Sequence, residues 1–394
     1  MFNFNYYTPT KVVFGKGTET QVSEQVKAFG GTKVLIHYGG KSALKSGLID
    51  RVKNSLDEAG IAHVELGGVV PNPHLSKVYE GIELGKREGI DFILAVGGGS
   101  VIDSSKAIAY GLGEPEFDVW ELYAKTRTAK KSLPVGTILT IAAAGSEMSN
   151  SSVITNEKTG EKRGCNFDIC RLKFAIMNPE LTMTLPDYQT QAGCTDIMMH
   201  TMERYFTQGG SMEITDAIAE GLLRTVMKNA LILHDDPKNY EARAEVMWCG
   251  SLAHNGLTGC GHDGMDFASH KLEHELSGMF DVTHGAGLAA IWPHWARYVY
   301  KNCLPRFVKF AVNVMQVEVG ANDEETALKA ITAMEEFYRK IGMPTNLHEL
   351  GINPTEEQIE QMAESCANGA GGKIGAAKIL LKDDMIAIYK MALQ

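Results

Sequence analysis

The sequence predicts a chain of two parts: an α/β part with a parallel sheet over residues 1–185, and an all-helical part over residues 186–394. In the first part short apolar runs alternate with amphipathic segments, which is typical of a parallel sheet covered by helices on both faces. After Pro186 the apolar positions recur at helical spacing, and strand patterns nearly vanish. No low-complexity linker separates the parts, so we expect a site in a cleft between them.

Four apolar runs of the first part are expected strands, namely residues 32–40, 62–69, 91–100 and 133–142. The segments between them are expected helices, namely residues 42–61 (with Ser42 as N-cap), 74–88 and 101–112. Sheets of this kind bind ligands at the carboxyl ends of their strands, which is where glycines stand in this sequence.

Helical periodicity in the second part covers residues 186–206, 213–234, 238–259, 266–278, 303–318 and 323–341. We expect a turn through Ser277 and Gly278, followed by a helix that begins near His284. The two parts therefore differ in their local structure, and we place the domain boundary at residue 185.

Composition excludes several classes of protein. The chain has 48 acidic and 38 basic residues and a net charge of −10, which disfavours binding to nucleic acid or to an anionic membrane. The first residues do not resemble a signal peptide, and no apolar run is long enough to span a bilayer. The seven cysteines form no CxxC pair, so we expect reduced thiols and a cytoplasmic location.

Histidines gather in the stretch "ASHKLEHELSGMFDVTHGAG". His270 and His274 are spaced to share one helix face, and His284 follows. Upstream, Asp196 and His200 have the same spacing on another expected helix. Imidazoles with a carboxylate suit a divalent transition metal. A single histidine on a helix face is more often an ordinary core residue, but two such pairs in one helical part favour the metal.

A competing motif overlaps this stretch. Residues 270–274 read "HKLEH", which matches an inverted zinc-peptidase pattern with Glu273 as the base that activates water. A pattern of five residues occurs easily by chance, and a peptidase has no use for a glycine-rich α/β part.

Two glycine turns indicate a nucleotide. In "AVGGGSVIDSSKAIA" the segment Gly97, Gly98, Gly99 and Ser100 follows a strand and opens a helix, where backbone N–H groups can bind phosphate. A tight turn that needs only small residues is the alternative. At the end of an earlier strand stand Gly39, Gly40, Lys41 and Ser42, with no acidic residue to bind a ribose 2′-hydroxyl. This turn favours NADP(H) over NAD(H).

These motifs together resemble the iron-containing (group III) alcohol dehydrogenases, in particular their NADPH-dependent butanol dehydrogenase and aldehyde reductase branch. The motifs run through nearly the whole chain and are "TPTKVVFGKG", "GGGSVIDSSKAIA", "AAGSEMS", "NPELTMTLP", "DIMMHTMERYF", "HKLEHELSG" and "THGAGLA". The resemblance implies a Rossmann-like dinucleotide-binding domain and a helical catalytic domain, in the dehydroquinate synthase-like architecture.

The resemblance also implies the roles of individual residues. It assigns the metal ligands to Asp196, His200, His270 and His284, with iron or zinc as the metal. His274 would line the site without holding the metal. Because an imidazole can change charge near neutral pH, we expect His274 to give a proton to the alkoxide. For the cofactor the resemblance implies Asn72, Gly97, Gly98, Gly99, Ser100, Thr140, Lys162 and Leu181. The predicted cofactor-binding residues also include Gly39, Gly40, Lys41, Ser42, Asp103 and Ser149. Lys41, in place of a family glycine, and an additional His262 depart from the pattern.

The implied reaction is hydride transfer between NADPH and a small aldehyde, in a cytoplasmic homodimer. A metal-dependent lyase of the dehydroquinate synthase type is the alternative, but no basic pocket for a phosphorylated substrate is evident near the metal-binding segments. A binding protein that has lost its chemistry is disfavoured, since all four ligand positions are intact.

Overall fold

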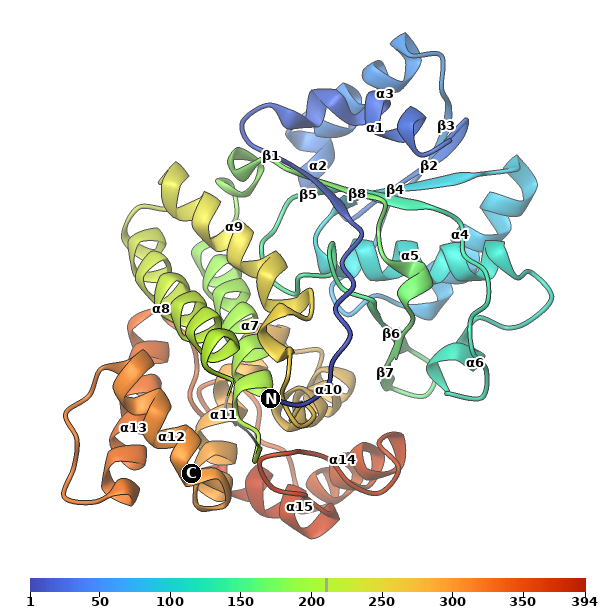
Figure 1. Cartoon of the computed structure of the whole chain (residues 1–394). Coiled ribbons are helices and arrows are strands. Elements are labelled where there is room, and N and C mark those ends of the chain that lie inside the picture. The colour runs from blue at the N-terminus through green and yellow to red at the C-terminus, as the bar shows by residue number, and fades with distance from the viewer. Residues whose placement is uncertain (210–211) are drawn as a thin grey trace. The chain divides into compact units, whose positions relative to one another are not determined.

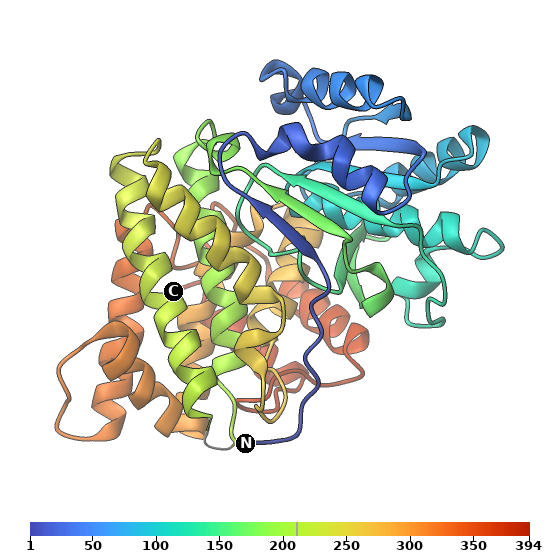
Figure 2. The ribbon, with the colours of Figure 1, turned by 45° about the horizontal axis from the view of Figure 1, so that its top comes forward.

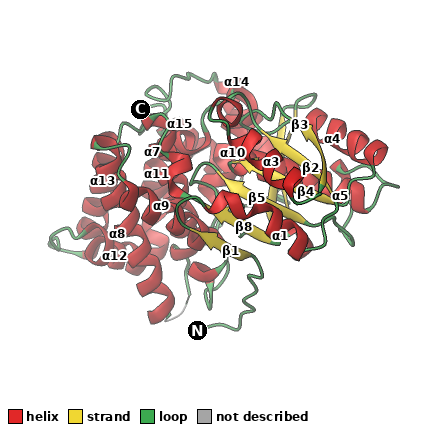
Figure 3. Cartoon of the chain, turned by 90° about the horizontal axis from the view of Figure 1, so that it is seen from above, coloured by secondary structure: helices red, strands yellow, loops and turns green. Residues whose placement is uncertain are grey.

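The structure, a computed structural model, describes residues 1–209 and 212–394. These residues form an α/β unit, Thr8–Thr184, and a helical unit made of Leu185–Gln394 together with Met1–Tyr7. Figure 3 shows the strands gathered in the α/β unit, whereas the helical unit is built from helices and loops. The predicted fold class, a parallel α/β sheet plus an all-helical part, is confirmed.

The α/β unit is built on a six-stranded parallel sheet with the order β1-β8-β5-β4-β2-β3. Its strands are β1 (Lys11–Phe14), β2 (Lys33–Tyr38), β3 (Ala62–Leu66), β4 (Phe92–Gly97), β5 (Val135–Leu139) and β8 (Phe174–Met177). The central strands β4 and β5 are buried along their whole length, so they read as continuous apolar runs rather than as alternating patterns.

Helices cover both faces of this sheet. The helices of this unit are α1 (Val22–Ala28), α2 (Ser42–Lys45), α3 (Leu48–Glu58), α4 (Leu75–Glu88), α5 (Gly99–Gly113) and α6 (Trp120–Tyr123). Figure 1 shows α1 and α3 on one face and α4 and α5 on the other. The apolar residues of α1 and α3 pack against β2 and β4 in one core cluster. This packing presents the carboxyl ends of the parallel strands, with their glycine turns, at one edge of the sheet.

Some local features of this unit differ from the sequence prediction, which did not include β8. The helix expected over residues 42–61 is broken at Gly47, whose φ of 68° lies in the left-handed region, and Lys41 rather than Ser42 takes the N-cap position. An antiparallel hairpin, β6 (Ser151–Asn156) and β7 (Glu161–Asn166), was not predicted. Its strands carry many polar residues, which obscure the apolar pattern used to recognise a strand.

The helical unit contains nine longer helices in the described part of the chain. They are α7 (Asp187–Tyr205), α8 (Glu213–Asp235), α9 (Tyr240–His254), α10 (Ala268–Phe280), α11 (His284–Val299), α12 (Leu304–Phe310), α13 (Asp323–Lys340), α14 (Glu356–Gly369) and α15 (Lys382–Met391). Helix α7 is buried along almost all of its length. Among the described residues, no helix is long and apolar enough to cross a membrane.

The connection between α10 and α11 corrects another prediction. The turn expected at Ser277 and Gly278 lies inside α10, which continues to Phe280 and ends at Asp281 with a φ of 51°. Helix α11 does begin at His284, as predicted. The N-terminal segment, Met1–Tyr7, also belongs to this unit (Figure 2). The backbone N–H of Phe2 donates to the carbonyl oxygen of Gly261 at 3.0 Å.

Candidate active site

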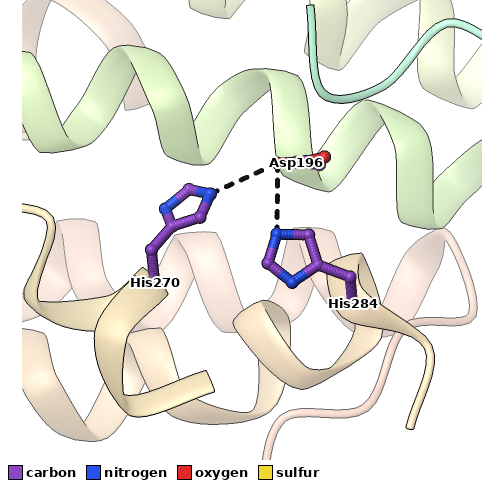
Figure 4. Close-up of side chains that lie close together, drawn as sticks. All are labelled: Asp196, His270 and His284. Carbon is purple, nitrogen blue, oxygen red and sulfur yellow. Dashed lines mark ion pairs between the residues drawn. The ribbon is translucent and has the colours of Figure 1, made fainter. Parts of the chain in front are cut away.

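Three side chains from three helices converge in the helical unit (Figure 4). Asp196 comes from α7, His270 from α10 and His284 from α11. The Asp196 Oδ1 atom lies 3.4 Å from Nε2 of His270 and 3.8 Å from Nε2 of His284. Their nearest donor atoms all lie within 4.8 Å of one another, which is the spacing that one bound cation needs.

The buried atoms of this group lack ordinary hydrogen-bond partners. Oδ1 of Asp196 and Nε2 of His270 are both inaccessible to solvent, and within the described chain neither has a partner in hydrogen-bond geometry, although Nδ1 of His200 lies 2.9 Å from Oδ1. Burial tends to raise the pKa of Asp196, but the imidazoles of His200 and His284 lower it well below its ordinary value. A buried, ionised carboxylate oxygen that faces an unpartnered imidazole nitrogen fits a metal ion as the missing partner.

His200 lies beside this group rather than within it. Its Nδ1 donates to the backbone carbonyl of Asp196 at 3.0 Å and lies 2.9 Å from Oδ1 of the same residue. Burial lowers the pKa of His200 to about 4, so this imidazole is neutral and carries its proton on Nδ1. The structure therefore brings three of the four predicted ligands together. In the fourth, His200, Nε2 carries no proton and keeps its lone pair.

Two further imidazoles adjoin the group. His274 lies one turn after His270 on α10 and is partly exposed, with its ring centroid 5.8 Å from that of His284. His254, which the sequence did not single out, packs its ring on that of His200 at 3.9 Å. His254 ends α9, and no spacing in the sequence connects it with the other histidines.

Two buried carboxylates that were not predicted at the metal site bind its histidines. Glu203 accepts a hydrogen bond from Nδ1 of His270, and Glu273 accepts one from Nδ1 of His284. Glu203 follows Asp196 by seven positions on α7, so helical spacing could have revealed it. Glu273 is 0% exposed and bound to His284, so it cannot activate a water molecule, and the peptidase interpretation is wrong.

The charge of this region also favours a cation. Three buried carboxylates, from Asp196, Glu203 and Glu273, lie among the histidine side chains of the site, and the buried guanidinium of Arg204 offsets part of their charge. Burial opposes protonation of His270, yet Glu203 and Asp196 raise its pKa to about 9. The same negative surroundings that retain a proton on His270 would stabilise a divalent ion there.

In the α/β unit the glycine turn has a packing role and opens a helix. A Cβ atom at Gly97 would lie 2.4 Å from the Val101 side chain, and one at Gly98 would lie 1.9 Å from Ile141. Small residues are therefore required here for packing. Helix α5 begins at Gly99, and the backbone N–H groups of its first residues point out of the helix, as anion sites require.

The segment after β5 adjoins this turn. Thr140 donates its backbone N–H to the carbonyl of Gly97 at 3.0 Å, so two predicted cofactor positions are neighbours. Ser149 is buried, and its hydroxyl lies 3.3 Å from the backbone nitrogen of Ser151. The carboxylate of Asp103 accepts the backbone N–H of Val153 at 3.0 Å, which ties α5 to β6.

The remaining predicted positions surround the carboxyl edge of the sheet or lie on the hairpin. Asn72 is buried in the loop after β3, with a φ of 53°. Lys162 is a buried residue of β7, and Leu181 lies in the short 3₁₀ helix Pro179–Thr182. The turn formed by Gly39, Gly40, Lys41 and Ser42 follows β2 directly and is largely exposed at Lys41 and Ser42.

His262 does not join the Asp196 group. It is buried, its Nδ1 lies 3.2 Å from the hydroxyl of Thr207, and its Nε2 lies 3.7 Å from a carboxylate oxygen of Asp216. Asp216 is held in turn by Arg306 at 2.7 Å and Lys309 at 2.6 Å. His262 therefore belongs to a buried charged network between α8 and α12.

Comparison with known proteins gives a consistent result over the whole chain. The family model described as iron-containing alcohol dehydrogenase matches residues 9–179, and the model for the C-terminal part of this family matches residues 190–393. The NADH-dependent butanol dehydrogenase A of Clostridium acetobutylicum is 41% identical over 391 residues, which is 99% of each chain. The NADPH-dependent aldehyde reductase YqhD of Escherichia coli is 36% identical over 355 residues, or 90% of each chain.

A solved structure has the same fold. The crystal structure of NADH-dependent butanol dehydrogenase A from Thermotoga maritima superposes with a TM-score of 0.96 at 41% identity, covering 100% of this chain and 99% of that one. These matches agree with the structure, which has a three-helix donor group and a parallel sheet with glycine turns. The chain belongs to the iron-containing alcohol dehydrogenase family.

Proposed function

We propose that this protein interconverts small primary alcohols, of about the size of butanol, and their aldehydes by hydride transfer with a nicotinamide dinucleotide. The observation that carries the proposal is the convergence of Asp196, His270 and His284 around unpartnered buried atoms, in a chain that also carries the glycine turns of a nucleotide site. Asp196, His200, His270 and His284 would hold one iron or zinc ion.

The chain's own residues would perform the rest of the chemistry. A divalent metal held by these donors would polarise a carbonyl group and stabilise the negative charge that develops on its oxygen. We propose that His274 gives a proton to the alkoxide, and its partly exposed position beside His270 and His284 supports this role. The turns at Gly97–Gly99 and Gly39–Ser42 would bind the diphosphate and the adenosine ribose.

We further propose a preference for NADP(H). Residues 39–42 carry no carboxylate that would repel a 2′-phosphate, and the exposed Lys41 adds a cation. The family includes relatives named for either cofactor, NADH for butanol dehydrogenase A and NADPH for the aldehyde reductase. The residues of this turn, rather than family membership, are therefore the support for the preference.

A kinetic measurement tests both parts of the proposal. Protein loaded separately with Fe²⁺ and Zn²⁺, with the metal content verified, is assayed for oxidation of NADPH and of NADH with butanal. We expect turnover with at least one metal and a higher kcat/KM with NADPH. Equal or higher kcat/KM with NADH would overturn the cofactor preference alone. Metal-loaded protein that oxidises neither cofactor with a range of small aldehydes would overturn the assigned reaction.

We also propose that the protein acts as a homodimer in the reducing cytoplasm. Strand β1 is at the edge of the described sheet, and large aromatic side chains are exposed near it in sequence, at Phe2, Phe4, Tyr6, Tyr7 and Phe14. Exposed edge strands and apolar patches are typical of subunit interfaces. All seven cysteines are unpaired in the structure. Sedimentation equilibrium should give twice the chain mass, and a monomer at micromolar concentration would contradict the dimer.

A further inference from the structure

We propose that Glu203 and Glu273 are positioning residues, each of which holds one histidine so that its Nε2 atom faces Asp196. The two histidines are His270 and His284, which contribute to the metal site put forward above. The inference therefore rests on the proposed function and deepens it, since it explains what orients the donors.

Glu203 accepts two hydrogen bonds from His270. One carboxylate oxygen accepts the hydrogen bond from ring atom Nδ1, and the other accepts the backbone N–H of His270 at 2.9 Å. Glu203 is 1% exposed, so water does not compete for these bonds. Rotation of the His270 ring would break the bond from Nδ1 and leave the buried Glu203 carboxylate without this partner, which would cost free energy.

Glu273 holds His284 in an equivalent way, from a different helix. Its Oε2 accepts the hydrogen bond from Nδ1 of His284, and its Oε1 accepts the hydroxyl of Ser277. An imidazole that binds a metal carries one N–H, so placing that hydrogen on Nδ1 leaves the Nε2 lone pair for the metal. Nε2 of His284 and Nε2 of His270 are the atoms that face Asp196. The two carboxylates thus select the tautomer that can bind a metal.

Gly287 provides the space that Glu273 needs. A Cβ atom at Gly287 would lie 2.9 Å from Cγ and 3.0 Å from Oε1 of Glu273. Gly287 follows His284 by three positions on α11, so it is on the same side of the helix. The Glu273 side chain therefore explains why a glycine, rather than a larger residue, stands at the second glycine position of "THGAGLA".

Metal affinity of substituted proteins tests the inference without relying on activity. Glu203 and Glu273 are each changed to Gln, which keeps an acceptor for Nδ1, and to Met, which has a similar length and accepts only weakly. Binding of Co²⁺ and Zn²⁺ to metal-stripped protein is measured by chelator competition, together with the Co²⁺ absorption spectrum. We expect the Met variants to lose about 10–100-fold in affinity and to alter the spectrum, and the Gln variants to recover much of the loss.

A double-mutant comparison tests the role of Gly287. Gly287→Ala should weaken Co²⁺ binding, and adding Glu273→Met should cause little further loss, because both changes act on the same bond. Gly221→Ala is the matched control, since a Cβ atom there meets nothing within 4 Å. If the losses of Co²⁺ affinity in the two single variants add up in the double variant, Gly287 does not act through Glu273.

The outcomes distinguish this inference from the proposed function. Folded Met variants, with metal-free melting temperatures near that of the wild type and unchanged Co²⁺ affinity and spectrum, would overturn the positioning role and leave the metal site intact. Wild-type protein that binds neither Co²⁺ nor Zn²⁺ would overturn the proposed metal site, and the positioning role with it.

Discussion

Gly285 meets the backbone of Ala192 so closely that a Cβ atom at Gly285 would lie 2.0 Å from the Ala192 carbonyl oxygen. Gly285 is next to His284 on α11, and Ala192 lies one turn before Asp196 on α7. The two helices therefore touch backbone to backbone beside the donor group. This approach is what lets His284 and Asp196, which are far apart in the sequence, share one site.

The contact predicts that Gly285→Ala lowers both the stability of the protein and its affinity for metal. The added methyl group must push α11 away from α7, and overpacking of this kind typically reduces the free energy of unfolding by about 1–3 kcal/mol or more. Urea unfolding and Co²⁺ titration should both show a loss, whereas the control Gly221→Ala should be neutral or slightly stabilising. A Gly285→Ala protein with wild-type stability and metal affinity would contradict the contact.

His37 predicts a pH dependence of stability. It is fully buried in β2, where its Nδ1 lies 2.8 Å from the Leu66 carbonyl and its Nε2 lies 2.9 Å from the Ser104 hydroxyl. Burial lowers its pKa from 6.5 to about 4. Between these values the unfolded chain takes up a proton that the folded chain does not, so the free energy of unfolding falls as the pH is lowered.

Chemical denaturation between pH 7 and pH 4 checks this expectation. His37→Gln should reduce the fall by up to roughly 3 kcal/mol, at about 1.4 kcal/mol for each pKa unit. The exposed His348 is the control, and His348→Gln should leave the slope as it is. An unchanged slope in His37→Gln would show that His37 does not remain neutral in the folded chain.

Lys106 predicts a link between a buried cation and cofactor binding. Its ammonium group is fully buried and donates to the carbonyls of Ser146 at 2.8 Å, Ser149 at 3.1 Å and Ser151 at 2.7 Å. Lys106→Met removes these bonds and should lower the free energy of unfolding by about 3 kcal/mol, as expected for lost bonds to a charged group. Loosening the segment that contains Ser149 should also raise the Kd for NADPH, measured by fluorescence. The exposed Lys158 serves as the control, and equal Kd values for both Met variants would exclude the link.

Lys41 predicts cofactor selectivity. Lys41→Asp should weaken NADPH binding at least fivefold more than NADH binding, because two like charges about 4 Å apart repel by about 1 kcal/mol even in water. Lys45→Asp, also an exposed position of the same short helical turn, is the matched control. The measurement is the Kd of NADPH and of NADH for each variant. Equal weakening of NADPH and NADH by Lys41→Asp would mean that Lys41 does not touch the 2′-phosphate.

His274 predicts a loss of turnover without loss of metal. If its imidazole gives the proton to the alkoxide, His274→Ala should lower kcat by about 10²–10⁴-fold while the bound metal remains at wild-type stoichiometry. His274→Gln retains a hydrogen-bond donor but cannot transfer a proton in the same way, so it should not restore kcat. Substantial rescue by Gln would indicate that His274 orients the substrate instead.

Much of the fold follows from local patterns in the sequence. The buried runs of β2, β4 and β5 and the periodic segments of α8 and α13 are recognisable because each element carries its own period or its own continuous apolar run. The break at Gly47 and the continuation of α10 through Gly278 were not predicted correctly. A glycine permits a helix to end as well as to continue, and neighbouring elements decide between the two.

The candidate site shows the same division. Spacing within single helices identified Asp196 with His200 and His270 with His274 as pairs, because residues four positions apart share a helix face. The sequence by itself therefore determined which residues are available to a metal. Only the tertiary structure decided which of them converge, because that depends on how α7, α10 and α11 pack. The close approach at Gly285 and the bonds from Glu203 and Glu273 join residues of different helices, and no period within one helix encodes such contacts.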